Sequence, residues 1–430
     1  MITGFRKISG LLMLVSIFVF GCSKPATKTV AQRNLADIYN PGKSSIHPDF
    51  FIHHINDSSS VLYIRIFPSE LLFSQANEEG KSLARLRIYY ELNELNPGKE
   101  GGVFIDSISI RKSLNKAEVR NSFFSGLPVK AVLGKKYSLK IEVSDEVRGI
   151  STQTILIADK STKYGAQNFK VITARNGYPS FTRYFAEGEA FRLQTNQIGI
   201  DSLFIDYFSL GRTLPRPSFS AAPEIPMKTI PDTSFSYYFS DTVHYSLPGP
   251  GIYHFRMNRD TKEGLTLFNF GESFPNVKTP DDLLGPLVYL TSTAEFRDIR
   301  MEPNRKLAID NFWLKLNPDI SSARELIRVY YKRVYFANIY FSSYKEGWKT
   351  DRGMIYIIFG PPRMLEKDSD MEKWTYFTKK GGPTAVFVFK RNENQFTNLD
   401  YQLERSAGSN AFWREAVDSW RKGKVYTIDF

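Results

Sequence analysis

Cysteine is almost absent from this chain of 430 residues, which contains one cysteine, Cys22, and five histidines. A single thiol cannot form an intramolecular disulfide or a cysteine-based metal site, so the fold depends on packing and hydrogen bonds. No histidine follows His254, and the chain has no G-x-S-x-G, P-loop or H-E-x-x-H motif. We therefore expect no nucleophile with a histidine base in the C-terminal part of the chain, and no metal or cofactor.

Long hydrophobic segments are also missing, because no stretch reaches the roughly 20 apolar residues of a transmembrane helix. A shorter apolar run, Leu11 to Phe20, follows the basic pair Arg6-Lys7 and ends beside Cys22. This order resembles a bacterial lipoprotein signal with its lipobox. The resemblance implies that residues 1–21 form a signal peptide and that Cys22 carries lipid, which makes the membrane a partner. The alternative is a signal-anchor helix with an incidental cysteine.

Residues 23–28 carry neither the aspartate that resembles an inner-membrane retention signal nor the acidic run that resembles a surface-export signal. By this analogy we expect the protein at the periplasmic face of the outer membrane. The polar stretch up to Pro48 has no sustained periodicity and contains several turn-forming residues, which predicts a flexible tether over residues 22–48. The net charge of +12 is spread among acidic residues, so we expect no nucleic-acid partner.

Apolar residues alternate with polar ones over residues 49–160, as in Tyr137, Leu139 and Ile141, and this period of two predicts strands. About six or seven such segments, separated by turns, predict an immunoglobulin-like sandwich. Residues 165–275 contain further strand patterns and a proline-rich connection between Pro215 and Pro231. We expect a second immunoglobulin-like sandwich there, with the connection crossing between sheets or over the surface.

Helical spacing replaces this pattern at Thr279-Pro280-Asp281-Asp282, which combines proline and acidic residues as helix starts do. A long helix is predicted from Ser321 to Tyr344, and a last amphipathic helix from Ser409. Between them, the apolar run Met354 to Phe359 and two later segments are predicted to be strands. Residues 280–430 are therefore expected to form an α+β domain, with helices packed on a small antiparallel sheet.

The turn between the long helix and the apolar run has a distinctive sequence, Gly347-Trp348-Lys349-Thr350-Asp351-Arg352-Gly353. Together with the later Gly360-Pro361-Pro362, it resembles the GWxTD domain of bacterial, chiefly Bacteroidetes-type, secreted and lipid-anchored proteins. The upstream segment 330–338 and the downstream segment 372–376 fit the same pattern, so the resemblance covers roughly the last third of the chain. It implies no established activity and no catalytic residues.

Aromatic rings and guanidinium groups near this turn suggest a binding site for a sugar, a carboxylate or a protein loop. The candidate residues are Trp348, Asp351, Arg352, Arg333, Tyr331 and Trp374. The structural alternative is that Asp351 pairs with Arg352 or Arg333 while Trp348 fills the seam between helix and sheet.

These features favour a lipid-anchored cell-envelope protein that acts as a non-catalytic binding or assembly module, with an envelope protein or glycan as its partner. The rival interpretation is a carboxylate-dependent hydrolase of envelope glycans, in which neighbouring strands bring Asp351 and Glu372 together. The two interpretations differ in one structural respect. A hydrolase needs such an acid pair in an open cleft, whereas a binding module does not.

Overall fold

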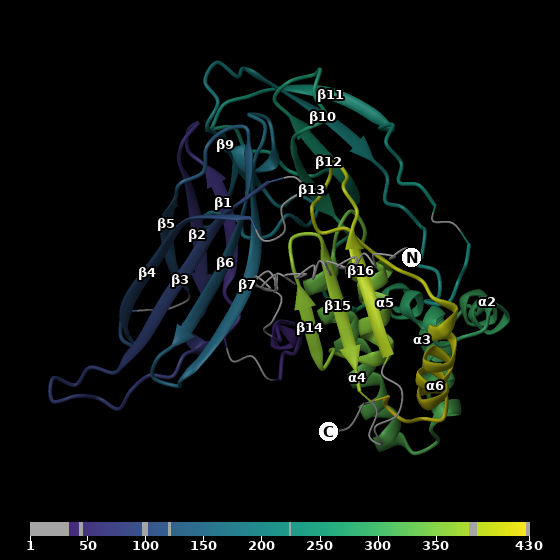
Figure 1. Ribbon diagram of the computed structural model, residues 1–430. Coiled ribbons are helices and arrows are strands. Elements are labelled where there is room, and N and C mark those ends of the chain that lie inside the picture. Colours follow the sequence, from purple (N-terminus) through teal and green to yellow (C-terminus); the bar gives the residue numbers. More distant parts are fainter. Residues whose placement is uncertain are drawn as a thin grey trace, which may run out of the picture.

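The computed structural model describes residues 34–42, 46–96, 102–118, 122–222, 225–377 and 385–426 (Figure 1). The expected signal peptide, residues 1–21, and the expected lipid site, Cys22, lie outside the described residues. Within the described part, no helix is both long and apolar enough to cross a membrane. The chain is multidomain, with several antiparallel sheets followed by a helical C-terminal region (Figure 1).

The first β unit, residues 49–160, consists of two facing antiparallel sheets, with strand orders β1-β2-β5 and β4-β3-β6-β7. One core joins them, because inward residues such as Leu62 and Ile64 on β2 pack in the same cluster as Ile88 on β3. Burial alternates along β2 as the period of two predicts. The strands are β1 Asp49–His54, β2 Ser60–Ile66, β3 Leu83–Leu95, β4 Val103–Asn115, β5 Phe123–Val129, β6 Lys135–Asp145 and β7 Ile150–Lys160.

The second β unit, residues 165–275, packs a four-stranded sheet of order β11-β10-β12-β13 against the β8-β9 pair. Phe191 on β9 and Phe255 on β12 belong to the core between these sheets. The proline-rich connection between β10 and β11 has no helix or strand in its described residues. The strands are β8 Phe169–Thr173, β9 Phe191–Thr195, β10 Ser202–Phe208, β11 Thr233–Tyr238, β12 Gly251–Arg256 and β13 Leu265–Asn269.

The C-terminal unit, residues 280–426, packs helices on an antiparallel sheet of order β14-β15-β16-β17 (Figure 1). Its helices are α1 Pro280–Leu284, α2 Thr293–Met301, α3 Arg305–Leu316, α4 Ile320–Phe341, α5 Asp351–Phe359 and α6 Asn410–Arg421, with short 3-10 turns η4 Gly285–Tyr289 and η5 Gly347–Lys349. Its strands are β14 Met364–Lys367, β15 Met371–Tyr376, β16 Ala385–Arg391 and β17 Tyr401–Leu403. The predicted start at Thr279 is confirmed, because its side chain caps α1 in a capping box.

The apolar run Met354 to Phe359 is helical, so its prediction as a strand was wrong. Every residue of α5 is buried, between α4, α6 and the sheet. A short run that is apolar on all sides does not distinguish a buried strand from a buried helix. Thr350 decides the matter locally, because its side chain accepts a hydrogen bond from the Gly353 amide at 3.0 Å and caps the helix.

Residues 34–42, expected within the flexible tether, instead pack against the C-terminal unit. They contain the 3-10 turn η1, Ala36–Tyr39, and both Ala36 and Tyr39 are buried in the core of that unit. The Asn34 side chain and the Leu35 amide bond to the backbone beside β14. Residues 34–42 are few and have no periodicity, so the sequence does not predict this docking. It depends on a surface more than 300 residues away in the chain.

Candidate functional site

The GWxTD-like turn fastens α4 to α5. Thr350 donates its hydroxyl to the Gly347 carbonyl at 2.8 Å while it caps α5. A Cβ added to Gly347 would lie 1.8 Å from the Ala337 carbonyl oxygen, and one added to Gly353 would lie 1.8 Å from the Gly347 carbonyl oxygen. Glycine is therefore required at both positions, because the backbone segments touch there.

Trp348 and Tyr331 both bind the segment that contains α1 and η4. The Trp348 amide donates to Asn338 Oδ1 at 3.1 Å, and the Trp348 carbonyl accepts a hydrogen bond from the Tyr289 hydroxyl at 2.6 Å. The Tyr331 hydroxyl donates to the Leu283 carbonyl at 2.9 Å. Trp348 is half-buried and its ring lies directly against Gly285. These contacts place Trp348 between helical segments, so the expectation that it fills a seam between helix and sheet is corrected.

Asp351 joins the start of α5 to the end of the sheet. Its carboxylate accepts the Leu403 amide at 2.8 Å and pairs with Arg405 at 2.6 Å. The partner expected from the sequence, Arg352 or Arg333, is therefore wrong. Arg405 lies far along the chain from this turn, and only the folded sheet brings the two side chains together.

Glu372, on β15, is the centre of a buried polar cluster and is 0% exposed. Its carboxylate pairs with Arg352 and with Lys367, each at 2.9 Å, and accepts the Tyr39 hydroxyl at 2.8 Å and the Trp374 indole N–H at 3.1 Å. Burial alone raises the pKa of Glu372, but Lys367 and Arg352 outweigh it and lower that pKa to about 2. The carboxylate is therefore ionised and fully engaged.

Arg333 is also buried, but it binds carbonyl groups rather than an acid. Its guanidinium donates to the carbonyls of Ile357 and Ile358, each at 3.1 Å, and to that of Tyr426 at 2.9 Å. Burial lowers the pKa of Arg333 to about 10. This side chain holds the C-terminal end of α5, whose last carbonyls otherwise lack helical partners.

The six predicted residues thus do not form one open binding site. Arg352 and Trp374 meet at Glu372, Trp348 and Tyr331 meet at the α1–η4 segment, and the other two bind elsewhere. Asp351 and Glu372 have different cationic partners and are both buried. They do not constitute the open acid pair on which the hydrolase interpretation depended.

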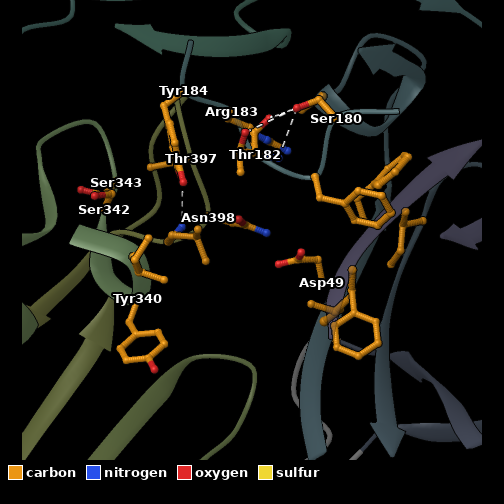
Figure 2. Close-up of a pocket in the computed structure, with 18 of the residues that line it drawn as sticks. Asp49, Ser180, Thr182, Arg183, Tyr184, Tyr340, Ser342, Ser343, Thr397 and Asn398 are labelled. Atoms are coloured by element: carbon orange, nitrogen blue, oxygen red, sulfur yellow. Dashed lines mark hydrogen bonds between the residues drawn. The ribbon is translucent and has the colours of Figure 1, made fainter. Parts of the chain in front are cut away.

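A cavity of about 830 Å³ lies where the three units meet (Figure 2). Asp49 lines it from β1, Thr182 and Arg183 from the second β unit, and Tyr340 and Asn398 from the C-terminal unit (Figure 2). Its volume is within the roughly 300–1,000 Å³ usual for ligand sites, which are often found between domains.

Most charges around the cavity are paired within the protein. Arg65 binds Asp49 at 2.6 Å, and His47 binds Glu70 at 3.0 Å. Burial raises the pKa of Asp49, and Arg65 opposes that effect in part. Because each of these two acids already has a basic partner, they make a poor acid–base pair in this structure.

Three residues that line the cavity each carry a buried polar atom with no hydrogen-bond partner among the described residues. These atoms are His47 Nε2, Ser343 Oγ and Arg391 Nε. Ser343 is 2% exposed, so its hydroxyl is almost fully removed from bulk solvent. Buried polar groups are usually hydrogen-bonded, so these three atoms are exceptions beside the cavity. They are closed off from solvent, and a molecule in the cavity would reach them only if neighbouring side chains moved.

Comparison with known protein families gives a match to the GWxTD domain over residues 251–422. The chain carries a GWxTD domain. This range begins at β12, so the matched GWxTD domain includes β12 and β13 of the second β unit as well as most of the C-terminal unit. The capped turn, Arg333, and Glu372 with its cations Arg352 and Lys367 all lie inside the GWxTD domain. Tyr39 and Tyr426, which bond to Glu372 and Arg333, lie outside the matched residues.

No curated protein matches the chain. Among solved structures, two of Bacteroides uniformis β-glucuronidase are similar to 33% of the chain, at 13% and 14% identity and a TM-score of 0.18. One of them is β-glucuronidase 2 covalently bound to cyclophellitol-6-carboxylate aziridine. The aligned part covers 15% and 16% of those chains, and a likeness this weak carries no argument about the GWxTD domain or its activity.

Sequence reasoning missed the cavity because its residues come from all three units. His47, Arg183 and Ser343 are more than 100 residues apart in the chain, and none belongs to a recognisable motif. The GWxTD domain supplies only part of the cavity wall. The charged and aromatic residues at the GWxTD turn suggested a binding site in the sequence, but in the structure these side chains hold the fold together.

Proposed function

We propose that this protein is a lipid-anchored cell-envelope protein that acts as a non-catalytic binding or assembly module, and that the cavity between its three units is the binding site. The observation that carries this proposal is the cavity itself, which is large enough for a ligand and is lined by polar side chains from all three units, such as Asp49, Thr182 and Asn398. The charged side chains of the GWxTD turn are, in contrast, engaged in the fold. The partner is expected to be an envelope protein or glycan.

The anchor in this proposal is lipid on Cys22, with the body at the periplasmic face of the outer membrane. The sequence of residues 6–22 supports it. Several acyl chains on one cysteine would bind a bilayer stably, at about 0.8 kcal/mol for each buried CH₂. Replacing Cys22 with alanine should move the protein from the membrane fraction to the soluble fraction. Tight membrane association of the Cys22→Ala variant would contradict the anchor.

The first β unit is proposed to be an immunoglobulin-like sandwich. Its orders β1-β2-β5 and β4-β3-β6-β7 place the third, fourth, sixth and seventh strands opposite the others. The Tyr137 hydroxyl, near the start of β6, accepts the Val132 amide at 3.0 Å, which is the arrangement of a tyrosine corner. The proposed domain limits are 49–160, 165–275 and 280–430.

A photo-crosslinking residue at Asn398 tests the binding site directly. Asn398 is exposed and lines the cavity, so a ligand or partner in the cavity should be captured there in intact cells (Figure 2). The same residue at Glu302, exposed at the end of α2 and away from the cavity, is the matched control. Capture of a discrete envelope species at position 398 but not at 302 supports the proposal. Equal yields at both positions would overturn it.

A further inference from the structure

Arg183 lies on the cavity wall in a segment whose backbone is firmly held. Its carbonyl accepts the Phe268 amide of β13 at 2.8 Å, and the Phe185 amide donates to the Phe268 carbonyl at 2.9 Å. Upstream, the Ser180 amide donates to the Val171 carbonyl at 2.8 Å. The position of Arg183 is therefore fixed by strands on both sides, which reduces the entropy cost of binding through it.

The guanidinium of Arg183 has no hydrogen bond or ion pair with any described residue. The other cations on the cavity wall have carboxylate partners: Arg65 has Asp49, Lys367 has Glu372, and Arg391 has Asp370. Arg183 is half-buried, and burial lowers its pKa without a nearby carboxylate to offset the effect. A half-buried cation without a partner attracts an anion more strongly than one in bulk water does, because the dielectric constant around it is lower.

The rest of the wall indicates what kind of molecule carries that anion. Polar side chains on the same wall, among them Gln167, Thr182 and Asn398, suit a ligand with several hydrogen-bonding groups. Phe181 and Tyr184 add aromatic faces to the same wall. Hydroxyl groups around an apolar ring face, together with one oxyanion, are the features of an acidic sugar.

We propose that the cavity binds an acidic saccharide whose carboxylate pairs with Arg183. This inference rests on the proposed function and specifies its ligand. The planar guanidinium presents two parallel N–H donors to a carboxylate, a geometry that lysine or a neutral amide does not reproduce. The saccharide hydroxyls bond to polar side chains of the cavity wall such as Thr182 and Asn398.

Calorimetric titration of the purified full chain with trigalacturonate tests this inference, and the methyl-esterified trisaccharide serves as the neutral comparator. Arg183→Gln should weaken trigalacturonate binding by roughly 10- to 100-fold, the usual range for losing a charge-assisted pair, and leave binding of the ester unchanged. Arg175→Gln is the matched control, since Arg175 is exposed in the preceding loop and does not line the cavity. Arg183→Lys should retain part of the affinity.

Several outcomes overturn the inference. Triglutamate is the peptide comparator. If only triglutamate binds through Arg183, the cavity recognises a peptide carboxylate and not a saccharide. Equal affinity for acid and ester, or no effect of Arg183→Gln, removes the anion contact. Absence of trigalacturonate binding also refutes the inference. Capture of an envelope species at position 398 would still support the proposed function in each case, so the two failures are distinguishable.

Discussion

Two arginines, Arg352 and Arg183, show how differently the chain treats a cation removed from water. Arg352 is 2% exposed, pairs with Glu372 at 2.9 Å, donates to the Leu399 carbonyl at 2.8 Å and lies 4.1 Å from the centre of the Tyr401 ring. Arg183 is fixed at the edge of a cavity and has no partner in the described structure. The first arrangement is complete without a ligand, whereas the second is incomplete. The family motif therefore marks a structural centre, and the cavity wall at Arg183 is the better candidate for binding.

Arg352→Gln should give the largest change in stability. It leaves Glu372 with one cation fewer in a site without solvent, and breaking a buried pair costs about 3–5 kcal/mol. Urea unfolding followed by tryptophan fluorescence measures the loss. The control is Arg328→Gln on α4, where the Arg328–Glu325 pair is more than half exposed and should contribute little to stability. Equal effects of the two substitutions would contradict a special role for the Glu372 cluster.

Acid should weaken the same cluster. The folded-state pKa of Glu372 is about 2, below the 4.5 of an unperturbed glutamate, so its contribution is present above pH 4.5 and is lost as pH falls toward 2. The difference corresponds to about 3 kcal/mol. Unfolding free energies measured across this window should fall less steeply in Glu372→Gln than in the wild type. The exposed-site variant Glu302→Gln should keep the wild-type slope.

Gly347→Ala should destabilise the GWxTD turn by about 2–3 kcal/mol, because its Cβ would meet the Ala337 carbonyl at 1.8 Å and that backbone atom belongs to α4. Gly249→Ala provides the control, since a Cβ there has no heavy atom within 4 Å. Its unfolding free energy should change by less than about 0.5 kcal/mol. Thermal and urea unfolding of both variants make the comparison. Similar losses at the two glycines would mean that the close approach is not needed.

Tyr39→Phe tests the docking of the N-terminal segment on the GWxTD domain. It removes the hydroxyl that donates to Glu372 at 2.8 Å and keeps the ring against Phe341, so the expected loss is about 1–2 kcal/mol. Hydrogen exchange should become faster over residues 34–42 before it changes elsewhere. Unchanged exchange in this segment would show that packing alone holds it.

The sequence predicts the large features of this fold because each leaves a local pattern. Alternation along β2 and β6 identifies strands, and Thr279 and Ser321 mark helix starts within two residues of their positions. The run Met354 to Phe359 was misassigned because a segment buried on every side has no polar face to reveal its period. Residue propensities and apolar patterns predict local geometry, but they do not show which other parts of the chain a segment packs against.

The candidate sites differ in the same respect. Charged and aromatic residues near Trp348 could be found in the sequence, but their roles depend on Arg405, Tyr39 and Lys367, which only the fold brings near. The cavity could not be predicted, because its walls come from three units. An unpaired side chain is a property of its surroundings in space, and residue type alone does not reveal it.

Arg183→Gln should have the smallest effect on stability, which completes the comparison with Arg352→Gln. Arg183 has no carboxylate to lose and is only half-buried, so replacing it with a neutral amide should change the unfolding free energy by less than about 0.5 kcal/mol. Urea unfolding of the two variants under identical conditions measures the contrast. A loss of several kcal/mol at Arg183 would reveal a structural partner and remove the reason to regard this side chain as available to a ligand. Because the same chemical change is made at both arginines, the difference between them reports what the fold supplies at Arg352 and not at Arg183, namely the Glu372 carboxylate, the Leu399 carbonyl and the Tyr401 ring.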